Sequence, residues 1–382
     1  MKNFNFRVPQ NIIFGMAALE QLPSILETCT SRSVYLISDR GLKNAGVVDR
    51  IVKIISDSGI ACHEYLDVIP NPTVDIVNDA AQGYKSSGAD CIIALGGGSP
   101  MDVAKAVGVL AKYGGEITDY EGAQKVPGPI VPLIAIPTTA GTGSEVTASS
   151  VITDEARNYK MAVISYYLFP DHAILDPSLI TTLPAHVAAA CGIDAFIHAE
   201  EAYVSKIANP FTDAMAEKAM ELIGGNIRRF IASRDDDEAA CAMMLGCTFA
   251  GLAFSWAKLG NVHAMSHPVS GYFHVAHGVA NAILLPTIVE YNALADKGRY
   301  YVVYNYVAEK KIEEKDFTPK MLADALRQLN KDLGIPASLS EVGVTEDKIP
   351  LMAIDAMKSG NVAVNPRQTT LKDVEALYTK AL

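Results

Sequence analysis

The sequence predicts an α/β N-terminal domain followed by an all-helical C-terminal domain. In the first half, short β-branched runs alternate with amphipathic stretches, which is typical of parallel strands joined by crossover helices. After Pro177 and Pro184 the pattern changes to long Ala-, Met- and Leu-rich stretches with helical periodicity. A chain of 382 residues fits two domains, since a domain typically has roughly 150 residues. We therefore expect an α/β domain at 1–180 and a helical domain at 181–382.

The individual elements of the first domain follow from these runs. Expected strands are Val34–Ser38, Ala61–Leu66, Asp90–Leu95 and Leu133–Pro137, and expected helices are Val47–Ser58 and Val74–Ser87. Gly59 and Gly88 can end the helices in the left-handed conformation. Ligands of such open sheets gather outside the carboxyl ends of the strands, so we expect the site in a cleft between the sheet and the helical domain.

Composition narrows the function classes. Hydrophobic residues make up 49% and charged residues 20% of the chain, which excludes disorder, collagen-like repeats and coiled coils. The net charge of −11 would repel nucleic-acid phosphates and anionic lipids, so neither is an expected partner. The six cysteines form no Cys-x-x-Cys pair, and the N-terminus lacks the apolar region of a secretory signal. We therefore expect reduced thiols and a cytoplasmic protein.

One segment resembles a membrane span by length alone. Ala239–Ala257 has nineteen residues without a charge, but it is rich in Ala, Gly, Cys, Ser and Thr and has no flanking basic cluster or aromatic belt. We expect a helix buried in the helical domain. The acidic run before it, Asp235 to Glu238, is expected to be a solvated loop that enters the first helical turn.

A glycine turn follows the expected strand Asp90–Leu95. Gly96, Gly97 and Gly98 let the backbone approach a ligand, Ser99 suits an N-cap, and Pro100 suits the first helical position. Unpaired N–H groups at such a helix start bind phosphate. The turn is neither the Gly-x-Gly-x-x-Gly fingerprint nor a P-loop, so a purely structural turn stays an alternative.

A second loop makes a nucleotide site more probable than a structural turn. Thr138–Ser144 follows the expected strand Leu133–Pro137 and offers hydroxyls and glycines for a ribose or a second phosphate. Two such loops at neighbouring strand ends suggest a dinucleotide. Asp39, at the end of another strand, could bind the adenosine ribose and repel a 2′-phosphate, which favours NAD over NADP. An equally good interpretation is that Asp39 caps the turn before Gly41.

The helical half carries a histidine-rich constellation. His263 and His267 are four residues apart, as are Asp194 and His198, so each pair shares one face of a helix. Gly271 is expected to end the helix of the first pair, and His274 and His277 follow it. Two such helices can converge on one divalent cation, Fe²⁺ or Zn²⁺. His267 or His274 could instead carry protons, because catalysis needs an open position on the metal.

Together these motifs resemble those of the iron-containing (group III) alcohol dehydrogenases, in the branch of lactaldehyde reductase and 1,3-propanediol dehydrogenase. The motifs are Gly96-Gly97-Gly98-Ser99-x-x-Asp102-x-Ala104-Lys105, Pro137-Thr138-Thr139-Ala140-Gly141-Thr142-x-Ser144-Glu145, Gly192-Ile193-Asp194-Ala195-x-x-His198 and Gly260-x-x-His263-x-x-x-His267-Pro268 with His277-Gly278. Gly334-Ile335-Pro336 and Asn365-Pro366-Arg367 extend the resemblance nearly to the C-terminus. Three positions depart from it: Ala276, where some relatives have Pro; Cys191, where a small hydroxyl residue or Gly is frequent; and Ser149, where lactaldehyde-type enzymes have Asn.

The resemblance implies a dehydroquinate synthase-like fold and an NAD(H)-linked, metal-dependent enzyme. The substrates would be short primary alcohols or diols and their aldehydes, and the assembly a homodimer or larger. It implies the metal ligands Asp194, His198, His263 and His277, with His267 in the proton path. The implied cofactor residues are Asp39, Asn71, Gly97, Gly98, Ser99, Thr138, Thr139, Thr142, Thr147 and Lys160.

Three alternatives remain. Dehydroquinate synthase-like lyases and glycerol dehydrogenases share the expected fold, NAD and a metal. A lyase acting on a phosphorylated substrate needs several cationic side chains, whereas the segments around the expected ligands offer Ala, Phe and Met. A metal hydrolase with Glu200 or Glu201 as base would leave both nucleotide loops unexplained.

Overall fold

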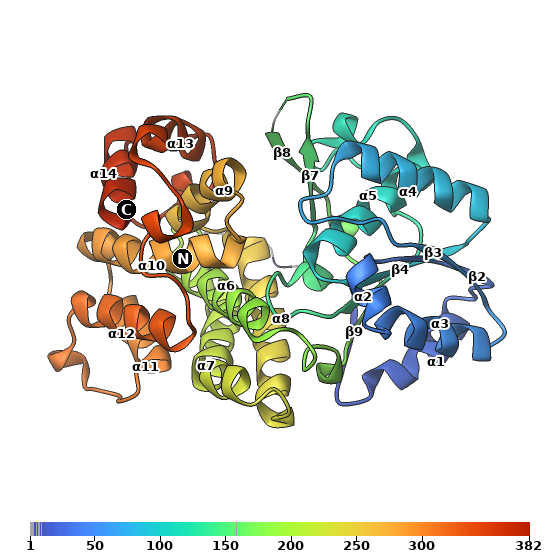
Figure 1. Cartoon of the computed structure of the whole chain (residues 1–382), viewed down its shortest axis with the longest axis horizontal. Helices are drawn as coiled ribbons and strands as arrows, with labels where there is room; N and C mark the ends of the chain where they lie inside the picture. Colours follow the sequence, from blue (N-terminus) through green and yellow to red (C-terminus); the bar gives the residue numbers. More distant parts are fainter. Residues whose placement is uncertain (1–3, 5, 7, 9, 158) are drawn as a thin grey trace. The chain divides into compact units, whose positions relative to one another are not determined.

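The computed structural model describes residues 4, 6, 8, 10–157 and 159–382, and it divides into two compact units (Figure 1). The sheet unit comprises residues 7–139 and 143–181. The helical unit comprises residues 140–142 and 182–382, with the described residues 4 and 6. Each unit has its own core and is described by itself.

The sheet unit is built on six parallel strands in the order β1-β9-β6-β4-β2-β3. The strands are β1 (Asn11–Phe14), β2 (Ser33–Ile37), β3 (Ala61–Tyr65), β4 (Cys91–Gly96), β6 (Leu133–Pro137) and β9 (His172–Leu175). This confirms the predicted parallel sheet, and the bounds of β6 agree with the sequence. The edge strand β1 and its partner β9 were not predicted, because their pairing joins residues far apart in the chain.

Helices cover both faces of this sheet. Side chains of α1 (Leu22–Thr28) and α3 (Val47–Asp57) pack in the core on one face. Side chains of α4 (Val74–Ser87) and α5 (Gly98–Tyr113) pack in the core on the other. A small second sheet, β5 (Gly122–Ala123), β8 (Tyr159–Ile164) and β7 (Ser149–Asp154), adds to the core of α4 and α5, and a short helix, α2 (Arg40–Asn44), follows β2. Gly59 and Gly88 take φ of +73° and +68°, which confirms their left-handed role after α3 and α4.

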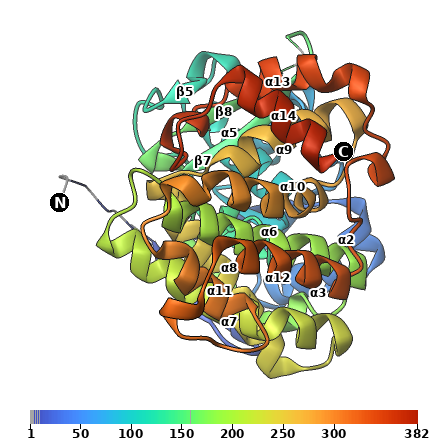
Figure 2. The same ribbon diagram turned by 90° about the vertical axis from the view of Figure 1, so that its left-hand side faces the viewer.

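The helical unit contains only helices and connecting segments between residues 182 and 382, as predicted (Figure 2). The helices are α6 (Ala185–Val204), α7 (Pro210–Ala232), α8 (Asp237–Ala257), α9 (Asn261–Phe273), α10 (His277–Asn292), α11 (Arg299–Val307), α12 (Pro319–Asp332), α13 (Ile349–Met357) and α14 (Leu371–Ala381). Helices α6, α7 and α8 pack against one another, and α10 packs on α6, α9 and α12.

Helix α8 is a core helix. It is the one helix of the described residues that is long and apolar enough to cross a membrane, yet 61% of its most apolar window is buried inside the protein. Asp236 caps its N-terminus by accepting from the Ala239 backbone N–H (2.9 Å), and Asp237 and Glu238 lie in its first turn. The structure therefore confirms both predictions: the helix is buried, and the acidic run before it enters the first helical turn.

Two predicted boundaries are wrong. Helix α5 begins at Gly98 with Gly97 as the N-cap, so Ser99 is not the N-cap and Pro100 is the third helical residue. This start is possible because the first-turn N–H groups have no intrahelical partner, so a proline there loses no bond. Helix α9 continues past Gly271 to Phe273, and His274 takes the left-handed position with φ of +56°.

Candidate functional site

The two predicted nucleotide loops lie side by side at the ends of β4 and β6. These strands are neighbours, and the Thr138 N–H donates to the Gly96 carbonyl oxygen (3.0 Å). A Cβ atom at Gly97 would lie 3.2 Å from Thr139 Oγ1, so glycine permits this close approach. The first intrahelical bond of α5 joins the Met101 N–H to the Gly97 carbonyl oxygen, so the N–H groups of Gly98 and Ser99 have no partner within the helix. N–H groups at such a helix start can receive an anion.

Lys105, on α5, holds residues 144–149, a segment that begins at the last residue of the second loop. It is fully buried, and its three ammonium N–H donors are shared among five oxygens at 2.7–3.1 Å: the carbonyls of Ser144, Thr147 and Ser149 and the hydroxyls of Ser144 and Thr147. Burial lowers the pKa of Lys105 to about 8, although the nearby Asp102 and Glu145 carboxylates favour its charge. Sequence reasoning quoted Lys105 in a motif but gave it no role.

Three other predicted cofactor residues make local contacts within the sheet unit. Lys160 donates to the Asn71 side-chain oxygen (2.7 Å), and Asn71 has a left-handed backbone with φ of +54°. Asp39 is the N-cap of α2 and accepts from the Leu42 N–H (2.9 Å) through Oδ1. The capping interpretation of Asp39 is therefore confirmed. Thr142 lies in the 140–142 segment of the helical unit.

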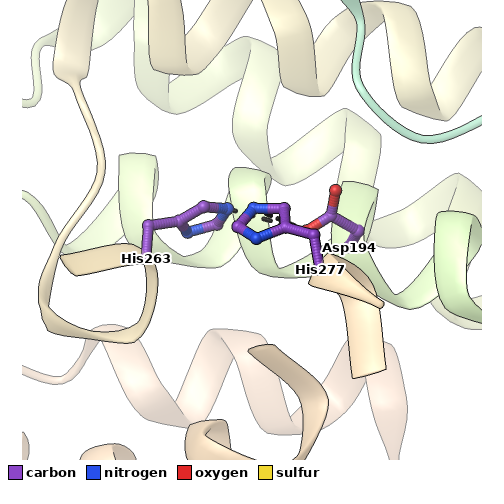
Figure 3. A group of neighbouring side chains, drawn as sticks. All are labelled: Asp194, His263 and His277. Atoms are coloured by element: carbon purple, nitrogen blue, oxygen red, sulfur yellow. Dashed lines mark ion pairs between the residues drawn. The ribbon is translucent and has the colours of Figure 1, made fainter. Parts of the chain in front are cut away.

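In the helical unit, one carboxylate and two imidazoles converge. Asp194 of α6, His263 of α9 and His277 of α10 place one ligand atom each within 4.8 Å of one another (Figure 3). Asp194 Oδ1 is 3.6 Å from His263 Nε2 and 3.9 Å from His277 Nε2. Residues from three helices, 83 positions apart at the extremes, thus meet in one cluster.

His198 and His267 flank this cluster in different ways. His198 lies one turn after Asp194 on α6; its Nε2 is 3.9 Å from Asp194 Oδ2, and its ring stacks on that of His263 with centroids 4.6 Å apart. His198 is buried and packs against Phe254. His267 is exposed, and its ring stacks on that of His277 at 5.2 Å.

Charges in the cluster compensate one another. Burial opposes the charge on Asp194, but His198, His277 and His263 outweigh it and hold the pKa of Asp194 well below its usual value. Burial lowers the pKa of His198 to about 4, which keeps its imidazole neutral at pH 7. Burial also disfavours a charged His263, yet the carboxylates of Asp194 and Glu201 raise its pKa above the ordinary 6.5.

Sequence reasoning missed Asn281, and it named Glu201 only as the base of an alternative hydrolase. Asn281, fully buried, donates through Nδ2 to Asp194 Oδ1 (2.6 Å), and the same nitrogen is 3.1–3.2 Å from the Nε2 atoms of His263 and His277. Its place four residues after His277 was the available signal, because the two share a helix face. Glu201 contacts His263 Nδ1 at 2.7 Å.

A divalent cation fits this donor set. Tetrahedral coordination with metal–nitrogen bonds of about 2.1 Å separates ligand atoms by about 3.4 Å, close to the 3.6 and 3.9 Å seen from Asp194. Imidazole with carboxylate suits Fe²⁺ or Zn²⁺. The Asp194 carboxylate offsets one of the two positive charges of such an ion, and the imidazoles supply neutral nitrogen donors.

Two models of one protein family match this chain. The family model of iron-containing alcohol dehydrogenases matches residues 9–177, and the C-terminal model of the same family matches residues 188–382. The chain is 36% identical to an NAD-dependent methanol dehydrogenase of Bacillus methanolicus, covering 99% of this chain and 100% of the relative. It is also 36% identical to a lactaldehyde reductase of Escherichia coli, covering 96% and 97%.

A solved structure extends this agreement to the fold. The crystal structure of a 1,3-propanediol oxidoreductase superposes with a TM-score of 0.96 at 35% identity and covers 100% of both chains. Two family models and full-length relatives therefore give the same answer, and the chain belongs to the iron-containing alcohol dehydrogenase family.

Proposed function

We propose that this enzyme interconverts short-chain primary alcohols or diols and the matching aldehydes, with NAD(H) as the hydride carrier and a divalent cation in the helical unit. The observation that carries the proposal is the convergence of Asp194, His263 and His277 in a chain of this family. The similar proteins are named for methanol, lactaldehyde and 1,3-propanediol, all of which are small. We infer a substrate of that size.

The residues of the cluster have different proposed roles. Asp194, His198, His263 and His277 would hold the cation, which when bound supplies Lewis-acid polarisation of the alcohol or aldehyde oxygen. His267 would carry the proton to or from solvent, which its exposed position beside His277 supports. Asn281 orients Asp194 through its Nδ2 hydrogen bond.

The strand ends of the sheet unit would bind the dinucleotide. Gly97, Gly98 and Ser99 would receive the pyrophosphate on their backbone, for which the start of α5 supplies unpaired N–H groups. Asp39 would contact the adenosine ribose and disfavour a 2′-phosphate. The remaining cofactor contacts would come from Asn71, Thr138, Thr139, Thr142, Thr147 and Lys160. Lys105 keeps the backbone at Thr147 in place.

The alternatives have less support. The full-length relatives named above are dehydrogenases and reductases rather than lyases. Phe254 against His198 gives the cluster an apolar neighbour, which suits a weakly polar alcohol better than a phosphorylated substrate. Glu201 accepts from the backbone of Val262 and contacts His263, so it is poorly placed to act as the base of a hydrolase.

Metal identity, location and assembly complete the proposal. Family membership favours iron, and the same donors fit Zn²⁺. Six free cysteines suit the reducing cytoplasm. A homodimer or larger homo-oligomer is our expectation from the family resemblance, and light scattering of the purified protein tests it.

The experiment is reconstitution of the metal-stripped, full-length protein. Fe²⁺ or Zn²⁺ is added anaerobically with NAD⁺ or NADH and a panel of short alcohols and aldehydes, and nicotinamide absorbance is followed. We expect turnover only after metal addition, with net NADH formed from 1,2-propanediol. A lyase would recycle its cofactor and give no net NADH. Equal turnover with and without metal would overturn the proposal.

A further inference from the structure

The N-terminus of α9, the helix of His263, is capped by side chains from distant segments. Its N-cap residue is Gly260, which has no side chain to accept a bond. Asn365 Oδ1 accepts from the Asn261 N–H (3.2 Å), and Glu201 Oε1 of α6 accepts from the Val262 N–H (2.6 Å). First-turn donors of a helix need such partners when they are buried. Glu201 and Asn365 together supply them.

The same Glu201 carboxylate also contacts the ring of His263. Its Oε2 lies 2.7 Å from His263 Nδ1, and the two residues are 3% and 1% exposed. A carboxylate oxygen accepts in this contact, so His263 donates to it through an N–H at Nδ1. The ring orientation then leaves Nε2 directed at Asp194. A metal ligand needs an unprotonated nitrogen on that side.

We propose that Glu201 is the positioning residue of the metal site: a single carboxylate fixes both the start of α9 and the tautomer of His263, so that Nε2 is available to the cation. This inference rests on the proposed function, since it assumes a cation at Asp194, His263 and His277. It assigns Glu201 a role through His263 and not in the reaction itself.

Gly260 supports this role independently. A Cβ atom at residue 260 would lie 2.8 Å from Glu201 Oε1 and 3.1 Å from Asn365 Oδ1. Its φ is −129°, which other residues also adopt, so the backbone conformation alone does not require glycine. The glycine is needed because the two capping side chains occupy the space beside it. The motif Gly260-x-x-His263 thus has a physical reason.

Glutamine at residue 201 would match the shape of the glutamate but not its bonding. A carboxylate accepts at both oxygens, whereas an amide accepts at one and donates at the other. If the amide nitrogen faces His263, Nδ1 must become the acceptor and the ring proton moves to Nε2, which blocks metal binding. If it faces Val262, two donors meet and the helix start is weakened.

The test measures cation affinity of the metal-stripped, full-length protein. The dissociation constant for Zn²⁺ is determined by competition with a chelating dye for wild type, Glu201→Gln and Glu200→Gln. Glu200 is the matched control, since it is the next residue of α6 and is equally buried. We expect a loss of about 10- to 100-fold for Glu201→Gln, typical of a lost partner of a ligating histidine. Glu200→Gln should stay within about threefold, well below that range.

Two further measurements separate a positioning role from general unfolding. Gly260→Ala retains the Glu201 carboxylate but displaces it, so this variant should weaken Zn²⁺ binding in the same direction even if Glu201→Gln folds poorly. The visible spectrum of bound Co²⁺ should change in both variants while circular dichroism stays native. Wild-type Zn²⁺ affinity in a folded Glu201→Gln or Gly260→Ala protein overturns this inference alone. Absence of Zn²⁺ binding by wild type overturns the proposed function as well.

Discussion

The proposed ligand groups of the sheet unit and of the helical unit are different kinds of atoms. At the ends of β4 and β6 the groups are backbone N–H donors, and glycines allow the two loops to touch. In the helical unit they are side chains of Asp194, His263 and His277, carried by three helices. A backbone site is damaged by adding atoms to glycines, whereas a side-chain site is damaged by removing single atoms. The two units should therefore respond differently to substitution.

The largest expected effect is in the helical unit, where His263 and His267 lie one turn apart on α9. His263→Ala removes a proposed ligand from the cluster, and we expect metal affinity to fall more than about 100-fold and activity with it. His267→Ala should keep the metal and lose turnover by about 100-fold, the loss of a proton carrier. Elemental analysis beside rate measurements checks both variants.

The control for this pair is His186→Ala, because His186 is exposed near the start of α6. It should retain metal and rate. A metal-replete, active His263→Ala protein would refute the ligand assignment, and a His267→Ala protein that loses its metal would make His267 a ligand rather than a proton carrier.

Substitution of Gly278 tests the packing of α10 on α6, which brings His277 close to Asp194. A Cβ atom at Gly278 would lie 2.0 Å from the Ala190 carbonyl oxygen, so alanine must push α10 away from α6. We expect Gly278→Ala to lower the free energy of unfolding by about 3 kcal/mol. Gly271→Ala is the matched control: its Cβ would meet nothing within 4 Å, and it should gain about 0.5–1 kcal/mol as a helical alanine. Urea denaturation of the metal-free proteins measures both, and similar midpoints would contradict the packing argument.

The sequence predicted the local features of this molecule better than its long-range ones. Periodicity placed α4 and β6 correctly, and the i, i+4 rule put Asp194 and His198 on one face of α6. The same rule could not tell which of His263 and His267 is the metal ligand. The choice of His277 as a ligand came from family resemblance. The contacts of Glu201 with Val262 and His263 were not predicted, because these partners lie on another helix, some sixty residues away in the chain.

In the sheet unit, the structure sharpens the test of Asp39. Because Asp39 caps α2, glycine there removes both the charge and the cap, whereas asparagine keeps an acceptor for the Leu42 N–H. If the carboxylate repels a 2′-phosphate, both variants should raise the ratio of kcat/KM for NADPH to that for NADH by about tenfold, from about 1–2 kcal/mol of removed repulsion. A rise in Asp39→Gly alone would assign the effect to the backbone instead of the charge.

The smallest effect concerns Asp90, which precedes β4 and ties the segment before β2. It accepts from the Ser31 hydroxyl (2.7 Å) and the Arg32 N–H (2.9 Å), and although partial burial opposes its charge, these bonds lower the pKa of Asp90 below the ordinary 3.8. A carboxyl with a depressed folded-state pKa stabilises the fold above its unfolded pKa, and this stability is lost as pH falls through the folded value. Since Asp90 is exposed, Asp90→Asn should lower the free energy of unfolding by less than about 1 kcal/mol at pH 7.

The difference in free energy of unfolding between Asp90→Asn and wild type should shrink below about pH 4, as the wild-type carboxyl becomes protonated. Asp57→Asn, another exposed carboxylate of the same unit, is the control, and a difference for Asp90→Asn that stays constant from pH 7 to pH 3 would show that its charge contributes nothing.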